Sequence, residues 1–165
     1  MQATQEEMLK AQSAMNELLE SNRLKEKELE SVNKEIQLKI ANALAESKNY
    51  LEAIDSSLGT IEFDLTGNII NANQNFLDLV GYSLSEIIGK HHSMFLFEQE
   101  KNSDNYKVFW DNLGKGKSNK NIFCRKRKDN SELWIDAIYK VFKDKEGNPY
   151  KILKFAYDIT EFKSK

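Results

Sequence analysis

Few residues of this chain have side chains with distinctive chemistry. Two adjacent histidines, His91 and His92, follow a Gly-Lys pair, and the single cysteine, Cys124, precedes a basic run that starts at Arg125. Imidazole can ligate a haem iron or hydrogen-bond a bound group. A lone cysteine excludes an internal disulfide, and no regular His/Cys/Asp spacing supports a structural metal site. The histidines are therefore the first candidates for a binding site.

Motifs typical of enzymes are absent from the sequence. There is no Gly-x-x-x-x-Gly-Lys loop, no Gly-x-Ser-x-Gly elbow and no carboxylate-rich strand end suited to cyclase metals. We therefore predict that the chain is not an enzyme. Nucleic acid is not an expected partner either, because 24 Lys and Arg residues are balanced by 26 Asp and Glu residues, a net charge of −2. The basic run 125–128 is interpreted as a solvated hairpin.

The sequence gives no sign of membrane insertion. No apolar run approaches the ~18 residues that a membrane helix needs, and the N-terminus lacks the pattern of a signal peptide. The single cysteine fits a reducing compartment. We expect a cytoplasmic location and no membrane contact by this chain, although its parent could be a membrane receptor.

Composition divides the chain near residue 57. Residues 1–57 contain no Gly, Pro, Phe or Trp and are rich in Glu, Lys, Leu, Ala and Gln, which favour helix. All seven Gly, the one Pro, all nine Phe and both Trp come later. We predict a long helix over 1–57 and a compact domain over 58–165.

The predicted helix has a seven-residue repeat, typical of a two-stranded coiled coil. Its a positions are Met8, Met15, Asn22, Leu29, Ile36 and Ala43, and its d positions are Ala11, Leu18, Lys25, Val32 and Lys39. After Ile36 the apolar positions slip by about four residues, a stutter that locally unwinds a supercoil. The alternative is a solvated helix that packs on its own domain. At ~1.5 Å per residue the helix would be roughly 80 Å long, more than a small domain can cover, so a parallel homodimer through the helix is predicted.

From Gly59 onward the pattern becomes that of strands and short helices. Asn73 and Gly81 would cap one helix, and Ser83 and Glu86 have the spacing of a capping box. Helices are expected at 73–82, 83–89 and 103–113, and strands at 60–64, 68–72, 119–128, 132–143 and 149–159. Both faces of the last two strands are largely apolar, so both must be covered.

In order and spacing these elements resemble a PAS sensor domain. The similar segments are GTIEFDLTGNIINANQNFLDLVGYSLSEIIGKHH, FWDNLGKGK and ELWIDAIYKVFKDKEGNPYKILKFAYDIT, within about residues 47–163. The similarity is greatest to PAS modules of bacterial methyl-accepting chemotaxis receptors and sensor kinases, where Gly-Lys-His-His is commonly followed by Met-Phe. The resemblance implies an α+β fold in which a long coiled-coil helix precedes a five-stranded antiparallel sheet with short helices on one face.

The resemblance also implies a binding site on the concave side of the sheet. The cofactor-binding candidates are His91, His92, Trp110, Asn121, Phe123, Arg125 and Tyr139. His92 would ligate or hydrogen-bond the cofactor, with Asn121 and Arg125 as polar anchors. Haem and FAD both stay open. The favoured alternative is that no cofactor binds and aromatic side chains fill the core, although a buried Arg125 would then need a partner.

The resemblance to PAS domains also implies which residues of the sheet lie on its outer face. They are Trp134, Ile138, Phe142, Leu153, Phe155 and Tyr157. The end of the long helix, with Tyr50, Leu51 and Ile54, is expected to cover them. Cys124 is also expected on this face as a small apolar filler.

The implied function is that of a sensor. The chain would pass a ligand, redox or gas signal through its dimeric coiled coil to a fused or downstream output module of a chemoreceptor or sensor kinase. The alternative is a cofactor-free PAS spacer that serves dimerisation and relay. A flavin photoadduct is not expected, because the segment from Lys90 to Phe95 lacks the reactive cysteine of light-sensing relatives.

Overall fold

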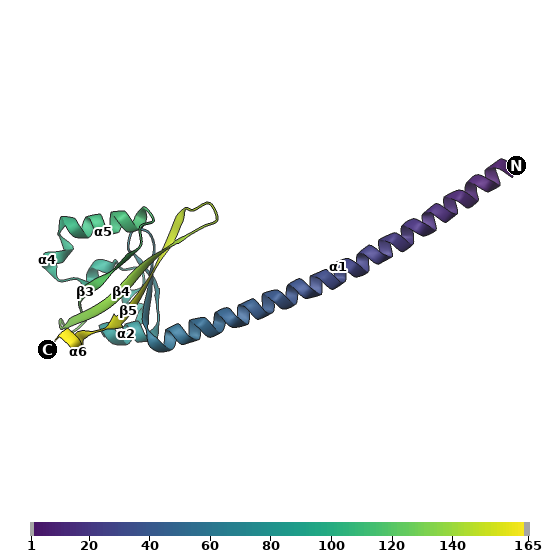
Figure 1. The fold of residues 1–165 in the computed structure, drawn as a ribbon. Coiled ribbons are helices and arrows are strands. Elements are labelled where there is room, and N and C mark those ends of the chain that lie inside the picture. The colour runs from purple at the N-terminus through teal and green to yellow at the C-terminus, as the bar shows by residue number, and fades with distance from the viewer. Residues whose placement is uncertain (1, 164–165) are drawn as a thin grey trace. The chain divides into compact units, whose positions relative to one another are not determined.

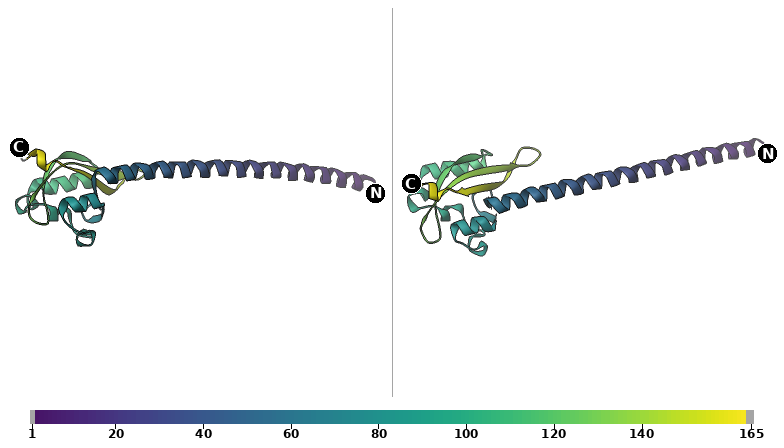
Figure 2. Two further views of the ribbon diagram at one scale, coloured as in Figure 1. Left: turned by 90° about the horizontal axis from the view of Figure 1, so that it is seen from below. Right: turned by 60° about the horizontal axis from the view of Figure 1, so that its bottom comes forward.

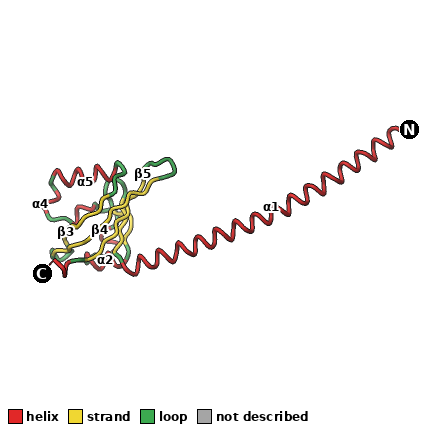
Figure 3. Tube along the Cα trace, in the orientation of Figure 1, coloured by secondary structure: helices red, strands yellow, loops and turns green. Residues whose placement is uncertain are grey.

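The computed structural model describes residues 2–163. It has two compact units, Met1–Tyr50 and Leu51–Lys165. A single helix, α1 (Gln2–Ser57), precedes all the strands (Figure 1, Figure 3). The predicted long helix is therefore confirmed, and its last turns belong to the same unit as the sheet.

The apolar positions of the α1 repeat are exposed in the single chain. The exposed side chains include Met8, Met15, Leu18, Leu29, Val32 and Ile36. Ion pairs one turn apart, such as Glu6 with Lys10 and Glu35 with Lys39, support the helix along its length. An apolar stripe of this kind needs a partner to leave water, so the homodimer stays a prediction.

The sheet has five antiparallel strands in the order β2-β1-β5-β4-β3. The strands are β1 (Gly59–Phe63), β2 (Ile69–Ala72), β3 (Asn119–Lys126), β4 (Glu132–Lys143) and β5 (Pro149–Asp158). The predicted fold class is confirmed, because two strands, several short helices and three strands follow one another as expected.

Short helices between β2 and β3 gather on one face of the sheet (Figure 1, Figure 2). They are α2 (Gln74–Val80), α3 (Leu84–Ile87), the 3₁₀ helix η1 (His92–Phe95), α4 (Glu98–Lys101) and α5 (Asp104–Gly114). Asn73 caps the start of α2, and Gly81 ends it with a φ of 78°, in the left-handed region that glycine favours. Ser103 caps α5 through its hydroxyl.

The two faces of the sheet are assigned as predicted. Along β4, the buried side chains of Leu133, Ile135 and Tyr139 alternate with more exposed ones such as Ile138. This period of two turns alternate residues to opposite faces. The inner residues form one core with the short helices.

The predicted helical cover of the outer face is wrong for most of that face. Tyr50 and Leu51 are exposed, and Ile54 is half-buried. Leu51 and Ile54 line a groove together with Leu153 and Phe155. Trp134 is instead contacted by a C-terminal helix, α6 (Thr160–Lys163). The Trp134 backbone N–H donates to the Thr160 hydroxyl at 3.0 Å, and the Lys163 Nζ lies 5.1 Å from the indole centroid.

Candidate functional site

A tight turn between β1 and β2 holds the histidine segment in place. Gly67, in this turn, has a φ of 96°, and its carbonyl accepts the His92 backbone N–H at 2.8 Å. The His91 Nε2 lies 2.9 Å from the Thr66 carbonyl oxygen, to which it can donate. A Cβ at position 67 would lie 2.6 Å from the His91 Nε2. Only glycine allows this close approach, so the turn fixes the backbone from which the His92 side chain enters the core.

The His92 imidazole is fully buried and held from both sides. Its Nδ1 shares a 2.8 Å hydrogen bond with the Tyr106 hydroxyl of α5, and its Nε2 shares a 2.9 Å hydrogen bond with the Tyr139 hydroxyl of β4. Burial first, and then the charges of Arg125 and Lys154, hold the pKa of His92 well below its usual range. The ring is therefore a neutral bridge between two tyrosines.

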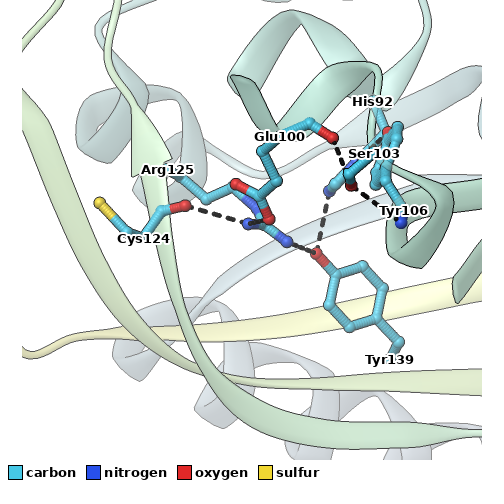
Figure 4. A network of polar contacts seen from close by, with 7 residues as sticks. All are labelled: His92, Glu100, Ser103, Tyr106, Cys124, Arg125 and Tyr139. Carbon is cyan, nitrogen blue, oxygen red and sulfur yellow. Dashed lines mark hydrogen bonds and ion pairs between the residues drawn. The ribbon is translucent and has the colours of Figure 1, made fainter. Parts of the chain in front are cut away.

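Arg125 of β3 extends this network toward α4 (Figure 4). Its guanidinium donates to the Tyr139 hydroxyl at 3.3 Å, to the Cys124 carbonyl at 3.0 Å and to the Glu100 carboxylate at 3.4 Å. It also lies 4.6 Å from the centre of the Phe123 ring. Burial opposes its charge, but Tyr139 and Glu100 favour it, and the pKa of Arg125 is raised. Its buried Nε has no hydrogen-bond partner within the described chain.

A second cation, Lys154 of β5, is buried beside the same tyrosine. Its Nζ lies 5.0 Å from the centre of the Tyr139 ring and 5.6 Å from that of Phe76. Among residues 2–163 it forms no ion pair within 4.0 Å. Burial, and secondarily the charge of Arg125, place the pKa of Lys154 well below its usual range. The core thus holds three basic side chains around one tyrosine.

Cys124 takes no part in this network through its sulfur. Its side chain points away from the Arg125 guanidinium (Figure 4). Burial, followed by the charge of Glu132, raises the pKa of the thiol. The side chain is therefore a protonated thiol rather than a thiolate nucleophile.

The structure brings together six of the seven sequence-predicted site residues. Trp110 packs edge-to-face against the His92 ring at 5.3 Å, and Phe123 packs against Tyr139 at 5.4 Å. Asn121 stands apart. It is exposed on the edge strand β3, and its side-chain oxygen accepts the Ile122 backbone N–H at 2.8 Å.

The sequence did not predict two residues of this network. Nothing in the sequence indicated that the Tyr106 hydroxyl would meet His92. Glu100 lies in α4, which is too short to leave a periodic pattern. The one available signal was that a buried Arg125 requires a partner.

The packing around His92 tests the two cofactors that the family resemblance implied. The rings of Phe63, Phe95, Tyr106, Phe109, Trp110 and Tyr139 all have centroids 5.3–6.5 Å from that of His92. Both ring nitrogens are already hydrogen-bonded. A haem or a flavin would have to displace these side chains, and Asn121 does not face the core. As arranged here, the residues fit neither group.

Two further features concern metals and membranes. Within the described residues, no group of three or more His, Cys, Asp or Glu side chains could hold a metal ion. None of the described helices has the length and apolar character needed to span a bilayer.

Comparison with known proteins identifies the family. A family model of the PAS fold matches residues 69–156, more than half of the chain. With the strand order and the helices on one face of the sheet, this match shows that the chain belongs to the PAS-fold family.

Individual relatives agree with this assignment. Biofilm dispersion protein BdlA of Pseudomonas aeruginosa is 37% identical over 109 residues, 66% of this chain and 26% of BdlA. The chain thus spans about a quarter of that relative's length. The solved PAS domain of a Colwellia psychrerythraea protein is 23% identical with a TM-score of 0.59, covering 69% of this chain and 97% of that one. A light-oxygen-voltage domain described with a flavin analogue is 24% identical with a TM-score of 0.58, covering 70% and 88%. At these identities the two structures support the fold alone.

Proposed function

We propose that this chain is the sensory PAS module of a larger bacterial signal-transduction protein, either a chemoreceptor or a sensor kinase. In this proposal the module works in the cytoplasm as a homodimer through α1. It catalyses no reaction itself and acts on a fused or downstream output module. The similarity to BdlA and the PAS family assignment support a signalling role.

The observation that carries this proposal is the junction between the end of α1 and the sheet. The Asn73 side-chain amide donates to the Leu58 carbonyl at 2.9 Å and to the Asp55 carboxylate at 3.0 Å. Its oxygen accepts the backbone N–H of Thr60 at 2.8 Å and of Phe76 at 3.0 Å. One side chain therefore ties together the last turn of α1, the first strand and the start of α2.

The junction supports relay because its parts cannot move separately without breaking hydrogen bonds. A change around Tyr139 reaches Lys154 on β5, and β5 pairs directly with β1. From β1 the junction leads to the end of α1. A relay of this kind requires two discrete arrangements with different affinity for the signal. We propose that these two arrangements come from the buried polar cluster, which consists of Tyr139 and the basic side chains of His92, Arg125 and Lys154 around it.

A second candidate function is a cofactor-free PAS spacer that only dimerises and relays. The observation that favours it is the filled core around His92. A spacer of this kind would use the same junction and the same α1 dimer, but it would have no ligand of its own.

Disulfide cross-linking of α1 tests the relay. In a Cys124→Ser background, Ile36→Cys should cross-link between subunits, because an a position faces its own copy across a parallel coiled coil. Lys154→Met in the core should then change the rate of cross-linking at position 36 by at least about twofold, if the cluster and the helix are coupled.

The matched control is Lys145→Met in the exposed β4–β5 turn, which should leave the rate unchanged. A chain that stays monomeric, or equal rates in the core and control variants, would contradict the relay. Analytical ultracentrifugation of each variant checks that a changed rate does not come from a changed amount of dimer.

A further inference from the structure

A groove of about 450 Å³ opens beside the buried cluster, where α4 and α5 approach β3. Its walls include Glu100, Ser103, Tyr106, Phe109 and Phe123. Three of these residues are aromatic. Two of them also reach the buried cluster, because Tyr106 contacts His92 and Phe123 contacts Arg125. The size suits a small organic ligand.

Arg125 lies behind these residues, and its guanidinium lacks a full set of hydrogen-bond partners. Besides its 3.0 Å hydrogen bond to the Cys124 carbonyl, it has a single contact of 3.4 Å to Glu100 and a contact of 3.3 Å to the Tyr139 hydroxyl. A guanidinium in a good pair makes two parallel bonds of roughly 2.7–2.9 Å to one carboxylate. The Nε of Arg125 is buried and donates to nothing in the described chain. The geometry therefore leaves room for a better anionic partner than Glu100.

Glu100 is placed so that it can be exchanged. Its side chain is 43% exposed, whereas that of Arg125 is 3% exposed. Its backbone carbonyl accepts the Ser103 hydroxyl at 2.8 Å and the Ser103 N–H at 3.1 Å. The carboxylate can therefore turn into water while the backbone of α4 stays anchored to the cap of α5.

We propose that this groove binds a small aromatic monocarboxylic acid, whose carboxylate replaces Glu100 on Arg125. Its ring packs on Phe109 and Phe123 where these two rings, in edge-to-face contact at 5.9 Å, line the groove. The proposal rests on the sensory function proposed above and names its ligand class. Displacement of Glu100 would change the contacts of α4 and, through Arg125 and Tyr139, reach the buried cluster.

The surrounding charges favour one carboxylate over two. Glu98 and Glu132 lie with Glu100 around a neighbouring surface groove. A second carboxylate on the ligand would face this acidic rim, and like charges held close together repel. The groove should therefore prefer benzoate to phthalate, which carries an additional carboxylate on the same ring.

The test uses the full chain with benzoate, phthalate and neutral benzamide as probes, measured by calorimetric titration and by the shift in melting temperature. Benzoate should bind with a Kd no weaker than the order of millimolar and should raise the melting temperature by mass action. Benzamide, which has the same shape without the charge, should bind at least about tenfold more weakly, because it cannot pair with the guanidinium.

Variants locate the binding. Glu100→Gln should tighten benzoate binding by at least about threefold, because it removes the competing charge from Arg125. Glu98→Gln, on the same short helix but paired with Lys101, should change it little. Arg125→Lys should lose at least about tenfold, since an ammonium cannot make the planar double contact. If Arg125→Lys unfolds, the Glu100 and Glu98 pair still decides the question.

Three results would overturn the proposal. They are equal binding of benzoate and benzamide, no effect of Glu100→Gln, and no binding of benzoate to the wild-type chain or to Glu100→Gln at a benzoate concentration about ten times the expected Kd. The relay is a separate matter. Benzoate binding without a change in α1 cross-linking would leave the ligand proposal standing and remove the relay, whereas a cross-linking response to Lys154→Met without benzoate binding would do the reverse.

Discussion

Leu29 of α1 and Leu133 of β4 are the same residue type in opposite surroundings. Leu29 is 61% exposed, whereas Leu133 is 1% exposed in the core beneath the short helices. The lysines differ in the same way. Lys39 of α1 is solvated and paired with Glu35, whereas Lys154 of β5 is buried without an ion pair among the described residues.

The two regions bury their apolar side chains in different ways. The sheet domain buries its apolar side chains within one chain and tolerates three basic groups in its core. The apolar repeat of α1 finds no cover of that kind in the chain by itself. A second copy would supply it, as in a coiled coil.

The sharpest test compares leucine truncation in the two regions. Leu133→Ala should lower the free energy of unfolding of the domain by about 2–5 kcal/mol, because it leaves a cavity in a packed core. Leu29→Ala should change it by less than about 0.5 kcal/mol. Urea unfolding followed by tryptophan fluorescence measures the domain alone, since both tryptophans lie there. Similar losses in the two variants would contradict the comparison.

Dimerisation should fail when a charge enters the repeat of α1. Leu29→Asp should weaken self-association by on the order of 100-fold, because each subunit would bring a charge into a desolvated seam. Sedimentation over a concentration series measures the change. Glu28→Asp, next to it on the helix and outside the a and d positions, is the matched control. A wild-type chain that is monomeric at ~100 μM, far above the Kd of a stable coiled coil, would remove the prediction.

Because of Lys154, the free energy of unfolding of the domain should increase as the pH rises. The pKa of Lys154 in the folded chain lies well below the usual 10.5, so between these values the unfolded chain binds more protons. Stability then increases with pH, by at most about 1.4 kcal/mol per unit. Lys154→Met should flatten this rise between pH 7 and 9 and stabilise the domain at pH 7. Lys140→Met, exposed on β4, should leave the slope as in the wild type. Urea midpoints across the pH range provide the measurement.

The smallest effect is expected on the outer face of the sheet. Trp134 is half-buried beneath Lys163, and its indole N–H donates to Glu132 at 3.1 Å. Trp134→Ala should cost about 1 kcal/mol, between an exposed site and a core site. A cost near 3 kcal/mol, measured by circular dichroism in urea, would indicate core-like cover and would reopen the case for a helical lid.

The sequence predicted the elements whose residues signal their own ends. Asn73 and Gly81 marked both ends of α2, and the change of period near Gly59 marked the start of the sheet. These signals are local, so one sequence is enough to read them. The inward face of Arg125 and Tyr139 was implied instead by the family resemblance, and both side chains are buried.

What could not be predicted depends on contacts between distant segments. The helices η1, α4 and α6 have four residues each, too few for a periodic pattern. The pairing of Glu100 with Arg125 joins residues that only the fold brings together. Asn121 followed the alternation rule but lies on an edge strand, where alternation does not guarantee burial.

The turn at Gly67 carries a consequence for the order of folding. The turn is local, since the Asp64 carboxylate accepts the Thr66 and Asn68 backbone N–H groups at 2.9 Å. The histidine segment docks onto it through the Gly67 carbonyl. Local contacts close at lower entropic cost than distant ones. The β1–β2 hairpin should therefore form first. The segment with His92 should dock onto it next, and β4 should bring Tyr139 into contact with His92 last.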